Sequence, residues 1–273
     1  MRFQFPSIQL VRLIWLLSWC VISSIFYHGK PCAAHQAEGS KLAQLADQFH
    51  IVIETEDESF PVQSSSGLIE ASNPNSSDLK TYLPIFLDEF AQYPPEVILR
   101  SGLKKIVLCR DLKVADQATA GLADHDNEIL YLDTGIGKDF PAKLLCLVIH
   151  HEFFHIIDSK ENHTYTDSSW SALNEPDFKY GSGWQSAKKT ATMFMLNYAL
   201  VGFLNRYSMS AVEEDKAEMF ANMMVDYRRV KERIELDDPI LEAKFLRIKE
   251  FLRKFCPSFN DAFWAKVSMK VIR

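Results

Sequence analysis

The segment Ile149–Asp158, IHHEFFHIID, restricts the fold of this 273-residue chain more than any other part of the sequence. Asp139 can cap a helix that has Pro141 in its first turn, and apolar residues then continue to Ile157. Three histidines and two acids interrupt this apolar run, although buried charged groups are costly unless they are paired or bound to a metal. The sequence therefore predicts a largely buried helix whose polar side chains meet a metal ion or close partners.

His151 and His155 are four residues apart, so on a helix both imidazoles project from the same face, one turn apart. This spacing lets two nitrogens bind one Zn²⁺ at roughly 2.0–2.1 Å. Glu152 is next to the first of these ligands and can reach a water molecule on the metal. The pattern is the HExxH motif typical of zinc peptidases, in which the Glu is the general base. His150 points to another side of the helix and is interpreted as a structural residue or a residue at the rim of the site.

A catalytic zinc needs a third protein ligand. A scheme with a further His six residues after the second and a Gly midway is excluded, because Glu161 and Asp158 occupy those positions. Glu214 and Glu218 are four apart on one face of a later helix, which Ser210 is expected to open as the cap of a capping box. One carboxylate, expected to be that of Glu214, can complete the zinc site, and the other can hydrogen-bond a ligand histidine. If the helix starts one turn away, Glu218 would be the ligand and Glu214 would make the hydrogen bond. Asp158 lies on the histidine face and is a second candidate for that hydrogen bond.

HExxH on one helix with ExxxE on a later helix resembles the glutamate-zincin, or thermolysin-like, peptidases. Within them it is similar to the lethal-factor-like and Pro-Pro endopeptidase group. Members of that group have a His-Glu-Phe-x-His helix, a later Glu-x-x-x-Glu and a Tyr seven residues before the ligand Glu. Here these positions are His151–His155, Glu214 to Glu218, and Tyr207. The sequence departs from the group at Phe154, where a small residue is usual, and by a long insert between the motifs. The resemblance covers roughly residues 78–235.

The resemblance implies a site with one catalytic Zn²⁺ held by His151, His155 and Glu214. Glu152 would be the general base for a zinc-bound water that attacks a peptide carbonyl, and Tyr207 would donate a hydrogen bond to the oxyanion. The expected function is an extracytoplasmic zinc endopeptidase that acts on a peptide or protein substrate, and the expected state is a monomer. The alternative is a catalytically inactive binding module on a zincin fold, against which the presence of Glu152 argues. A structural zinc domain is disfavoured, because no cysteine has ligand spacing.

The sequence predicts an α+β fold of the zincin type, with a single metallopeptidase domain over residues 35–273. A small mixed α/β N-terminal lobe, about 41–158, contains the HExxH helix. A mostly helical lobe, about 159–273, follows, and the active-site cleft is expected between the two. Short strands are expected at 106–108 and 129–132.

Three further expectations concern the surroundings of the cleft. Residues 62–77, rich in Ser, Asn, Gly and Pro, are expected to form a loop. A helix is expected near 187–204. The run 127–132 is a candidate for the cleft-edge strand on which an extended peptide would pair.

The first 34 residues have the order of a secretory signal peptide. Arg2 and Arg12 precede a largely apolar run at 13–27, and small residues follow at 32–34. Because the run approaches the length of a membrane span, an uncleaved membrane anchor is the alternative. The protein is therefore expected to be secreted or extracytoplasmic, with membrane contact only through this segment.

Charge and cysteine content restrict the partners and cross-links that are expected. The formal net charge is −6 and Lys and Arg form no block, so nucleic acid is not expected as a partner. Beyond the leader only Cys109, Cys146 and Cys256 remain, and at most two of them can pair. Burial of free thiols is the favoured interpretation.

Overall fold

The structure is a computed structural model that describes residues 33–56, 58–138, 140–161, 167–181 and 194–270. Most of the predicted leader lies outside these described residues, and so does Asp139, the predicted helix cap. Within the described ranges, no helix is both long and apolar enough to cross a lipid bilayer.

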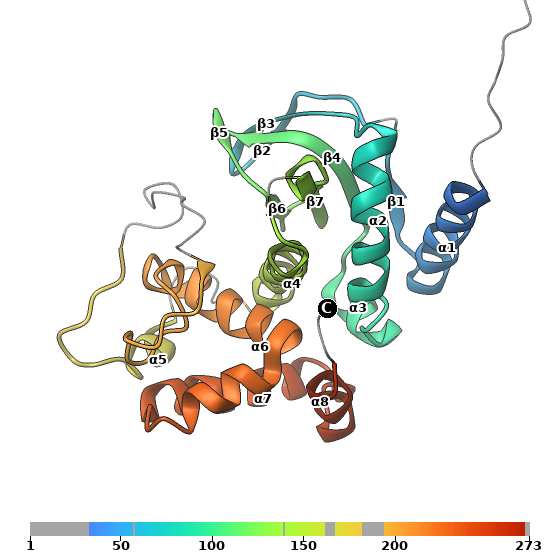
Figure 1. Cartoon of the computed structure of the whole chain (residues 1–273). Coiled ribbons are helices and arrows are strands. Elements are labelled where there is room, and N and C mark those ends of the chain that lie inside the picture. The colour runs from blue at the N-terminus through green and yellow to red at the C-terminus, as the bar shows by residue number, and fades with distance from the viewer. Residues whose placement is uncertain (1–32, 57, 139, 162–166, 182–193, 271–273) are drawn as a thin grey trace, which may run out of the picture. The chain divides into compact units, whose positions relative to one another are not determined.

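The described strands gather in the N-terminal part of the chain, and most of the later elements are helices (Figure 1). The strands are β1 (Val52–Glu54), β2 (Val62–Ser64), β3 (Gly67–Ser72), β4 (Lys105–Val114), β5 (Gln117–Ala118), β6 (Gly121–Asp124) and β7 (Ile129–Asp133). The α-helices are α1 (Ala33–Phe49), α2 (Ser76–Phe90), α3 (Pro95–Ser101), α4 (Ala142–Asp158), α5 (Ser168–Ser171), α6 (Val212–Ile234), α7 (Pro239–Phe255) and α8 (Asp261–Ser268). Short 3₁₀ turns are η1 (Gly135–Lys138), η2 (Ser159–Glu161) and η4 (Tyr207–Met209). The chain therefore has the predicted α+β layout, a mixed sheet followed by a helical C-terminal part.

Strand β4 is the centre of a seven-stranded mixed sheet. Its first half pairs in parallel with β1 and β7, and its second half pairs antiparallel with β3 and β5. In the described part of the chain β6 pairs only with β7, so β6 forms one edge of the sheet. The expectation that 127–132 is an edge strand is therefore wrong, because β7 has a paired strand on each side.

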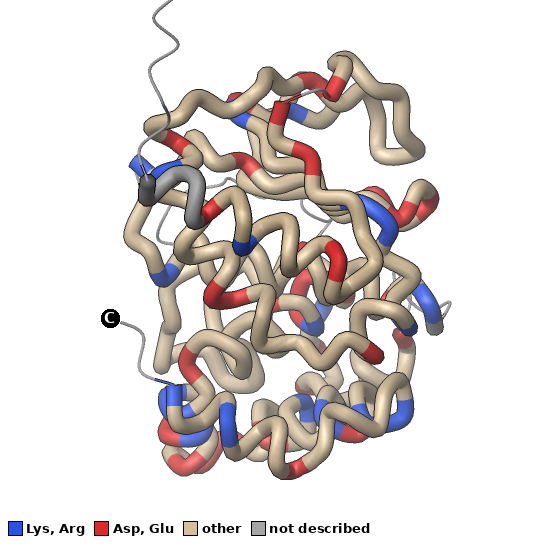
Figure 2. Tube along the Cα trace, turned by 90° about the vertical axis from the view of Figure 1, so that its right-hand side faces the viewer, with Lys and Arg blue, Asp and Glu red and all other residues tan. Residues whose placement is uncertain are grey.

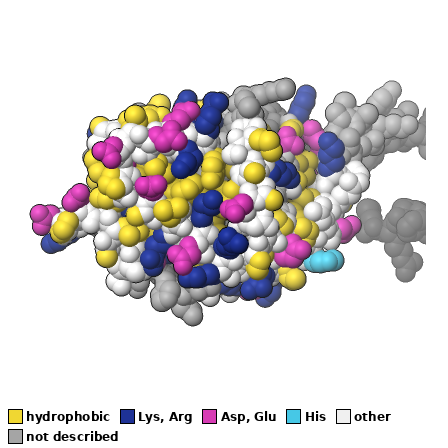
Figure 3. All heavy atoms as spheres, turned by 90° about the horizontal axis from the view of Figure 1, so that it is seen from below, with side chains coloured by type: hydrophobic (Ala, Val, Ile, Leu, Met, Phe, Trp, Pro, Cys, Tyr) yellow, Lys and Arg dark blue, Asp and Glu magenta, His cyan; other side chains and the backbone are white. Residues whose placement is uncertain are grey.

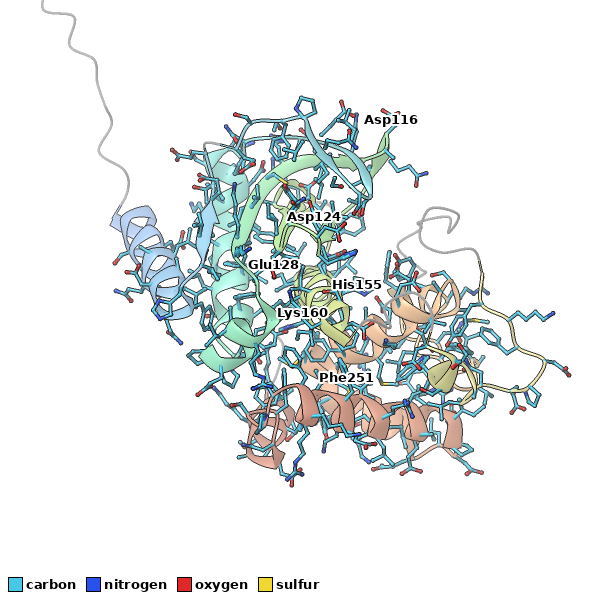
Figure 4. All side chains as sticks on the ribbon, turned by 180° about the vertical axis from the view of Figure 1, so that it is seen from behind. Asp116, Asp124, Glu128, His155, Lys160 and Phe251 are labelled. Carbon is cyan, nitrogen blue, oxygen red and sulfur yellow. The ribbon has the colours of Figure 1, made fainter. Side chains whose placement is uncertain are left out.

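Helix α4 lies below the sheet and packs on α6 with its other side (Figure 1). The rings of Phe154 on α4 and Phe220 on α6 are 5.1 Å apart, and both side chains are fully buried. Just after α4, Lys160 Nζ lies 2.7 Å from Glu128 Oε1, next to β7, which ties this end of the helix to the sheet (Figure 4). A helix covered on two sides in this way exposes few polar side chains, so its histidines and acids point into the protein.

The predicted loop at 62–77 is wrong in part, because β2 and β3 form an antiparallel hairpin there. The Ser and Gly residues that suggested a loop form its tight turn. Gly67 has a φ of +125°, which favours glycine, and Ser64 Oγ donates to the carbonyl oxygen of Gly67. Ile69 of β3 is fully buried, which gives the hairpin its own place in the core.

The predicted helix near 187–204 is wrong over its described part, since residues 194–204 form turns. The reason lies in contacts with helix α7. The N–H of Gly202 donates to Asp238 Oδ2 at 2.8 Å, and the Gly202 carbonyl accepts from Lys244 Nζ at 2.7 Å. Backbone groups that bond to these side chains cannot also form a helical ladder.

The capping box at Ser210 is also not formed. The N-cap residue of α6 is Ala211, without a side-chain cap, and Ser210 Oγ instead donates to the carbonyl oxygen of Tyr207. Because α6 nevertheless begins close to the expected residue, Glu214 and Glu218 keep the predicted helical face.

The described thiols are buried, whereas charged residues of both signs lie at the surface. Cys109, Cys146 and Cys256 are free and buried, as predicted. Figure 2 shows acidic and basic residues scattered over the trace, and Figure 3 shows mixed charges among apolar side chains on the face seen from below. Neither sign of charge dominates that face.

Candidate metal centre

Three side-chain atoms from two helices converge beneath the sheet. His151 Nε2 and His155 Nε2, one turn apart on α4, are 3.1 Å from each other. Glu214 Oε2, from the first turn of α6, is 3.0 Å from His151 Nε2 and 3.7 Å from His155 Nε2. In Figure 4, His155 lies on α4 between the sheet that carries Asp124 and the C-terminal helices. The structure therefore brings together the three predicted ligands, with Glu214 rather than Glu218 in the third position.

This arrangement fits a zinc ion. Two donor atoms bound to one Zn²⁺ at ordinary bond lengths and the tetrahedral angle lie about 3.4 Å apart, close to the three distances found here. Glu214 Oε2 is buried and, despite its closeness to His151, it has no hydrogen-bond donor among the described residues. A buried carboxylate oxygen without a partner is costly, and a cation shared with both Nε2 atoms would satisfy it. Two His and one Glu are also a donor set of catalytic zinc sites, which leave a fourth position open.

Glu218 lies behind the cluster. Its Oε1 is 2.9 Å from His151 Nδ1, on the opposite side of the imidazole from Glu214. A carboxylate at this position favours the tautomer with the proton on Nδ1, so that Nε2 presents a lone pair to the metal. Glu218 itself is held by two amides, Asn205 Nδ2 at 2.5 Å from Oε2 and Asn222 Nδ2 at 2.9 Å from its backbone oxygen. Neither asparagine belongs to a sequence motif, because its partner is brought close only by the fold.

His151 and Glu214 have pKa values that their surroundings shift in opposite directions. Burial acts to lower the pKa of His151, but Glu214 and Glu218 outweigh it and hold this pKa well above the usual value. Burial acts to raise the pKa of Glu214, but contacts with His151 and His155 bring it well below the usual value. A metal ion binds neutral imidazole, so metal binding at this site would release the proton of His151.

Glu152 lies at the edge of the cluster beside strand β6. A Cβ atom added to Gly121 of β6 would be 2.6 Å from Glu152 Cγ, so only glycine lets the strand approach so closely. Glu152, Gly121 and the three candidate ligands line one cavity of about 90 Å³. The carboxylate predicted as general base thus borders the same space as the candidate metal.

Tyr207 reaches the cluster from the short turn η4. Its ring is 5.7 Å from that of His151, and the side chain is 6 % exposed. Burial and the nearby carboxylates, Glu214 first, raise the pKa of Tyr207 well above the usual value. The phenol therefore keeps its proton and can donate a hydrogen bond.

Comparison with known proteins places these motifs in a family. Residues 85–254, more than half of the chain, match a family described as "Putative zinc-binding metallo-peptidase". The chain belongs to this metallopeptidase family. A crystal structure of another protein of the same description, from Bacteroides caccae ATCC 43185, has a similar fold with a TM-score of 0.55 and 17% identity. That alignment covers 88% of this chain and 93% of the other. No curated protein matches the sequence.

Other acids of this metallopeptidase contribute to the site differently from the sequence interpretation. Asp158, a candidate partner of a ligand histidine, instead lies 2.7 Å from Lys216 Nζ on α6. Asp215, the residue after Glu214, is buried and accepts hydrogen bonds from Trp170 and Tyr180. Asp158 contacts α6 two residues after Glu214, at Lys216, and Asp215 directly follows Glu214. Their contacts therefore hold the first turn of α6 in place.

A second cavity of the metallopeptidase, of about 390 Å³, adjoins the first. It shares His151, Glu152 and Tyr207 with the metal cluster, and its walls are largely apolar. The apolar walls are Ile136, Phe140, Leu144, Leu147, Val148 and Phe194. Leu144 and Val148 precede Glu152 at intervals of four on α4, so one helix face carries both the apolar wall and the acid.

Proposed function

We propose that this protein is a zinc-dependent endopeptidase of the glutamate-zincin type, similar to the lethal-factor-like and Pro-Pro endopeptidase group. The observation that carries the proposal is the convergence of His151 Nε2, His155 Nε2 and Glu214 Oε2 beside the carboxylate of Glu152. The signal-peptide pattern at the N-terminus supports action outside the cytoplasm.

His151, His155 and Glu214 would hold the metal. Zinc in such a site lowers the pKa of water to near 7 and polarises a carbonyl group. Glu152 takes a proton from the attacking water and later returns it to the leaving amine. The hydroxyl group of Tyr207 donates a hydrogen bond to the carbonyl oxygen as negative charge develops there. In comparable sites such a hydrogen bond lowers the barrier by about 3–4 kcal/mol.

The edge position of β6, which pairs only with β7 among the described residues, supports an extended peptide as the substrate. Gly121, Leu122 and Ala123 of this strand line the metal cavity, and a peptide added to an edge strand gains main-chain hydrogen bonds. One of its side chains next to the scissile bond would enter the apolar cavity beside Val148. Burial of a large apolar side chain contributes about 1.5–3 kcal/mol, so peptides with an aromatic or long aliphatic residue there are the expected substrates.

Elemental mass spectrometry of the purified protein tests the metal site. We expect near-stoichiometric zinc in the wild type and in Glu152→Gln, and a strong loss in Glu214→Ala. Full zinc content in Glu214→Ala would contradict the ligand assignment.

Incubation with a random peptide library tests the chemistry. The wild type should cleave peptides with a large apolar residue beside the scissile bond, and Glu152→Gln should not cleave them. Zinc binding without any cleavage by the wild type would favour the binding-module alternative.

A further inference from the structure

Asn205 is a fully buried side chain that uses its donor and acceptor groups on two different parts of the site. Its Nδ2 donates to Glu218 Oε2 at 2.5 Å and, more weakly, to the carbonyl oxygen of Phe194 at 3.4 Å. Its Oδ1 accepts from the backbone N–H of Ser208 at 2.9 Å and from the Ser208 hydroxyl at 3.0 Å. A buried amide with both ends satisfied has one orientation only.

We propose that Asn205 is a positioning residue that connects the candidate ligand His151 to Tyr207. The contacts through Glu218 to His151 are called the metal arm, and the contacts through Ser208 to the turn that carries Tyr207 are called the Tyr207 arm. The metal arm depends only on the zinc site, whereas the Tyr207 arm rests on the proposed function.

The metal arm consists of two consecutive contacts. Asn205 holds one oxygen of the Glu218 carboxylate, and the other oxygen faces His151 Nδ1 at 2.9 Å. The orientation of the carboxylate therefore restricts the direction of the imidazole. Asn222 supports only this arm, because its amide contacts Glu218 and not the turn at 207–209.

The Tyr207 arm adds a side-chain contact to a short turn that Ser210 and the backbone N–H of Gly181 also hold. The turn η4 is three residues long, and Arg206, at its start, makes no side-chain cap. The two hydrogen bonds from Ser208 to Asn205 Oδ1 enclose Tyr207, which lies between these residues in the sequence. Tyr207 faces His151 across a ring distance of 5.7 Å, so a shift of this turn moves the phenol relative to the metal cluster.

A purely structural asparagine would affect stability alone, and the test separates the two roles. The variants are Asn205→Leu, which keeps the approximate shape, and Asn205→Ala, which leaves room for water to satisfy the freed groups. Asn222→Ala removes support from the metal arm alone. Asn260→Ala is the matched control, because Asn260 caps α8 by accepting from the N–H of Phe263, remote in sequence from the site.

The first measurement is zinc affinity, by competition with a chromophoric chelator, together with the visible absorption spectrum of the Co²⁺-substituted protein. We expect both Asn205 variants and Asn222→Ala to bind zinc about 10- to 100-fold more weakly and to change the Co²⁺ spectrum. Asn260→Ala should lower the urea midpoint and leave both metal readouts at wild-type values. Wild-type zinc affinity and spectrum in the folded Asn205 variants would overturn the metal arm, whether or not the protein cleaves peptides.

The second measurement is kcat at saturating zinc on a peptide that the wild type cleaves. Asn205→Ala should lower kcat about 10- to 100-fold because Tyr207 is displaced, and this loss should exceed that of Asn222→Ala, which disturbs the metal arm alone. In a Tyr207→Phe background, Asn205→Ala should cause little further loss, since its effect acts through the phenol. Independent, multiplicative losses would overturn the Tyr207 arm. If the wild type binds zinc but cleaves no peptide, the proposed function and the Tyr207 arm fail together, and the zinc measurements still decide the metal arm.

Discussion

Gly121 shows how a single residue determines the distance between the sheet edge and the proposed general base. In Gly121→Ala the new Cβ would meet Glu152 Cγ at 2.6 Å and Val148 Cγ1 at 3.2 Å, so the carboxylate has to move. Since displacement of a catalytic group by about 1 Å can cost 10²-fold in rate, we expect kcat/KM to fall 10- to 100-fold with zinc content unchanged.

Peptide cleavage assays and zinc analysis check this prediction against Gly39→Ala. Gly39, in α1, has no atom within 4 Å of an added Cβ, so this control should keep full activity. Its stability should stay equal or rise by about 0.5–1 kcal/mol, because Ala is the better helix former. Wild-type kcat/KM in Gly121→Ala would show that Glu152 does not need the close approach.

Tyr207 is the second residue whose role can be tested in isolation. Tyr207→Phe removes the hydroxyl but keeps the ring contacts with His151 and Phe194. We expect kcat to fall about 100- to 1,000-fold with KM little changed, as for loss of an oxyanion donor. The zinc Kd should stay near the wild-type value, because the phenol is not among the converging ligand atoms. A lowered zinc affinity with unchanged kcat at saturating zinc would point to a structural role.

At the scale of elements, the first turn of α6 is fixed by ion pairs on both sides of Glu214. Lys216 pairs with Asp158 of α4, and Lys244 of α7 lies 2.7 Å from Asp215 Oδ2. Lys244 is fully buried, and its ammonium also lies 3.7 Å from the ring centre of Phe203. Helix α7 supplies none of the three candidate ligands, but its Lys244 forms a buried ion pair with the residue directly after Glu214.

Lys244→Met should lower the free energy of unfolding by about 3–5 kcal/mol, because it leaves the carboxylate of Asp215 buried and unpaired. Adding Asp215→Asn should recover part of this loss, since the amide oxygen can still accept from Trp170 and Tyr180. Urea unfolding measures both. The matched control is Lys254→Met on the same helix, whose exposed pair with Glu250 should contribute less than about 1 kcal/mol. Equal effects of the two lysine variants would contradict the argument.

The sequence predicted those parts of the site that depend on helical spacing. His151 with His155 and Glu214 with Glu218 share faces because residues four apart on a helix always do. Asn205 and Lys244 carried no such signal, since their partners are set by tertiary packing. The register of α6 was found although its cap was wrong, whereas the turns at 194–204 were missed because side chains of α7 compete for their backbone groups.

At the scale of the whole described domain, a buried polar cluster joins the N-terminal part to the end of the chain. His150 of α4 is fully buried, donates from Nε2 to Glu89 Oε2 of α2 at 2.8 Å, and accepts at Nδ1 from the hydroxyl of Tyr93. Lys270, beyond α8, also contacts Glu89 Oε2. His150 is therefore structural, which is one of the two roles that its direction on the helix predicted. The cluster links segments that are far apart in the sequence to the helix that carries His151.

This cluster should make stability depend on acid pH. Burial acts to raise the pKa of Glu89, but His150 and Lys270 lower it to about 2, whereas the unfolded chain has about 4.5. A carboxylate with a lowered pKa stabilises the fold fully above pH 4.5, and this contribution, about 3 kcal/mol, is lost as the pH falls towards 2. Burial lowers the pKa of His150, which destabilises the fold further as the pH falls below 6.5.

Urea unfolding of the wild type and Glu89→Gln at pH 6, 4.5 and 3, with EDTA present so that no metal contributes, isolates the Glu89 contribution. Glu89→Gln should be less stable than the wild type at pH 6, because the ion pair with Lys270 is absent. The gap should shrink from pH 4.5 to pH 3, since only the wild type loses this carboxylate. A gap of constant size over that range would show that Glu89 does not carry a lowered pKa, and that the end of the chain is held to α2 without this charge.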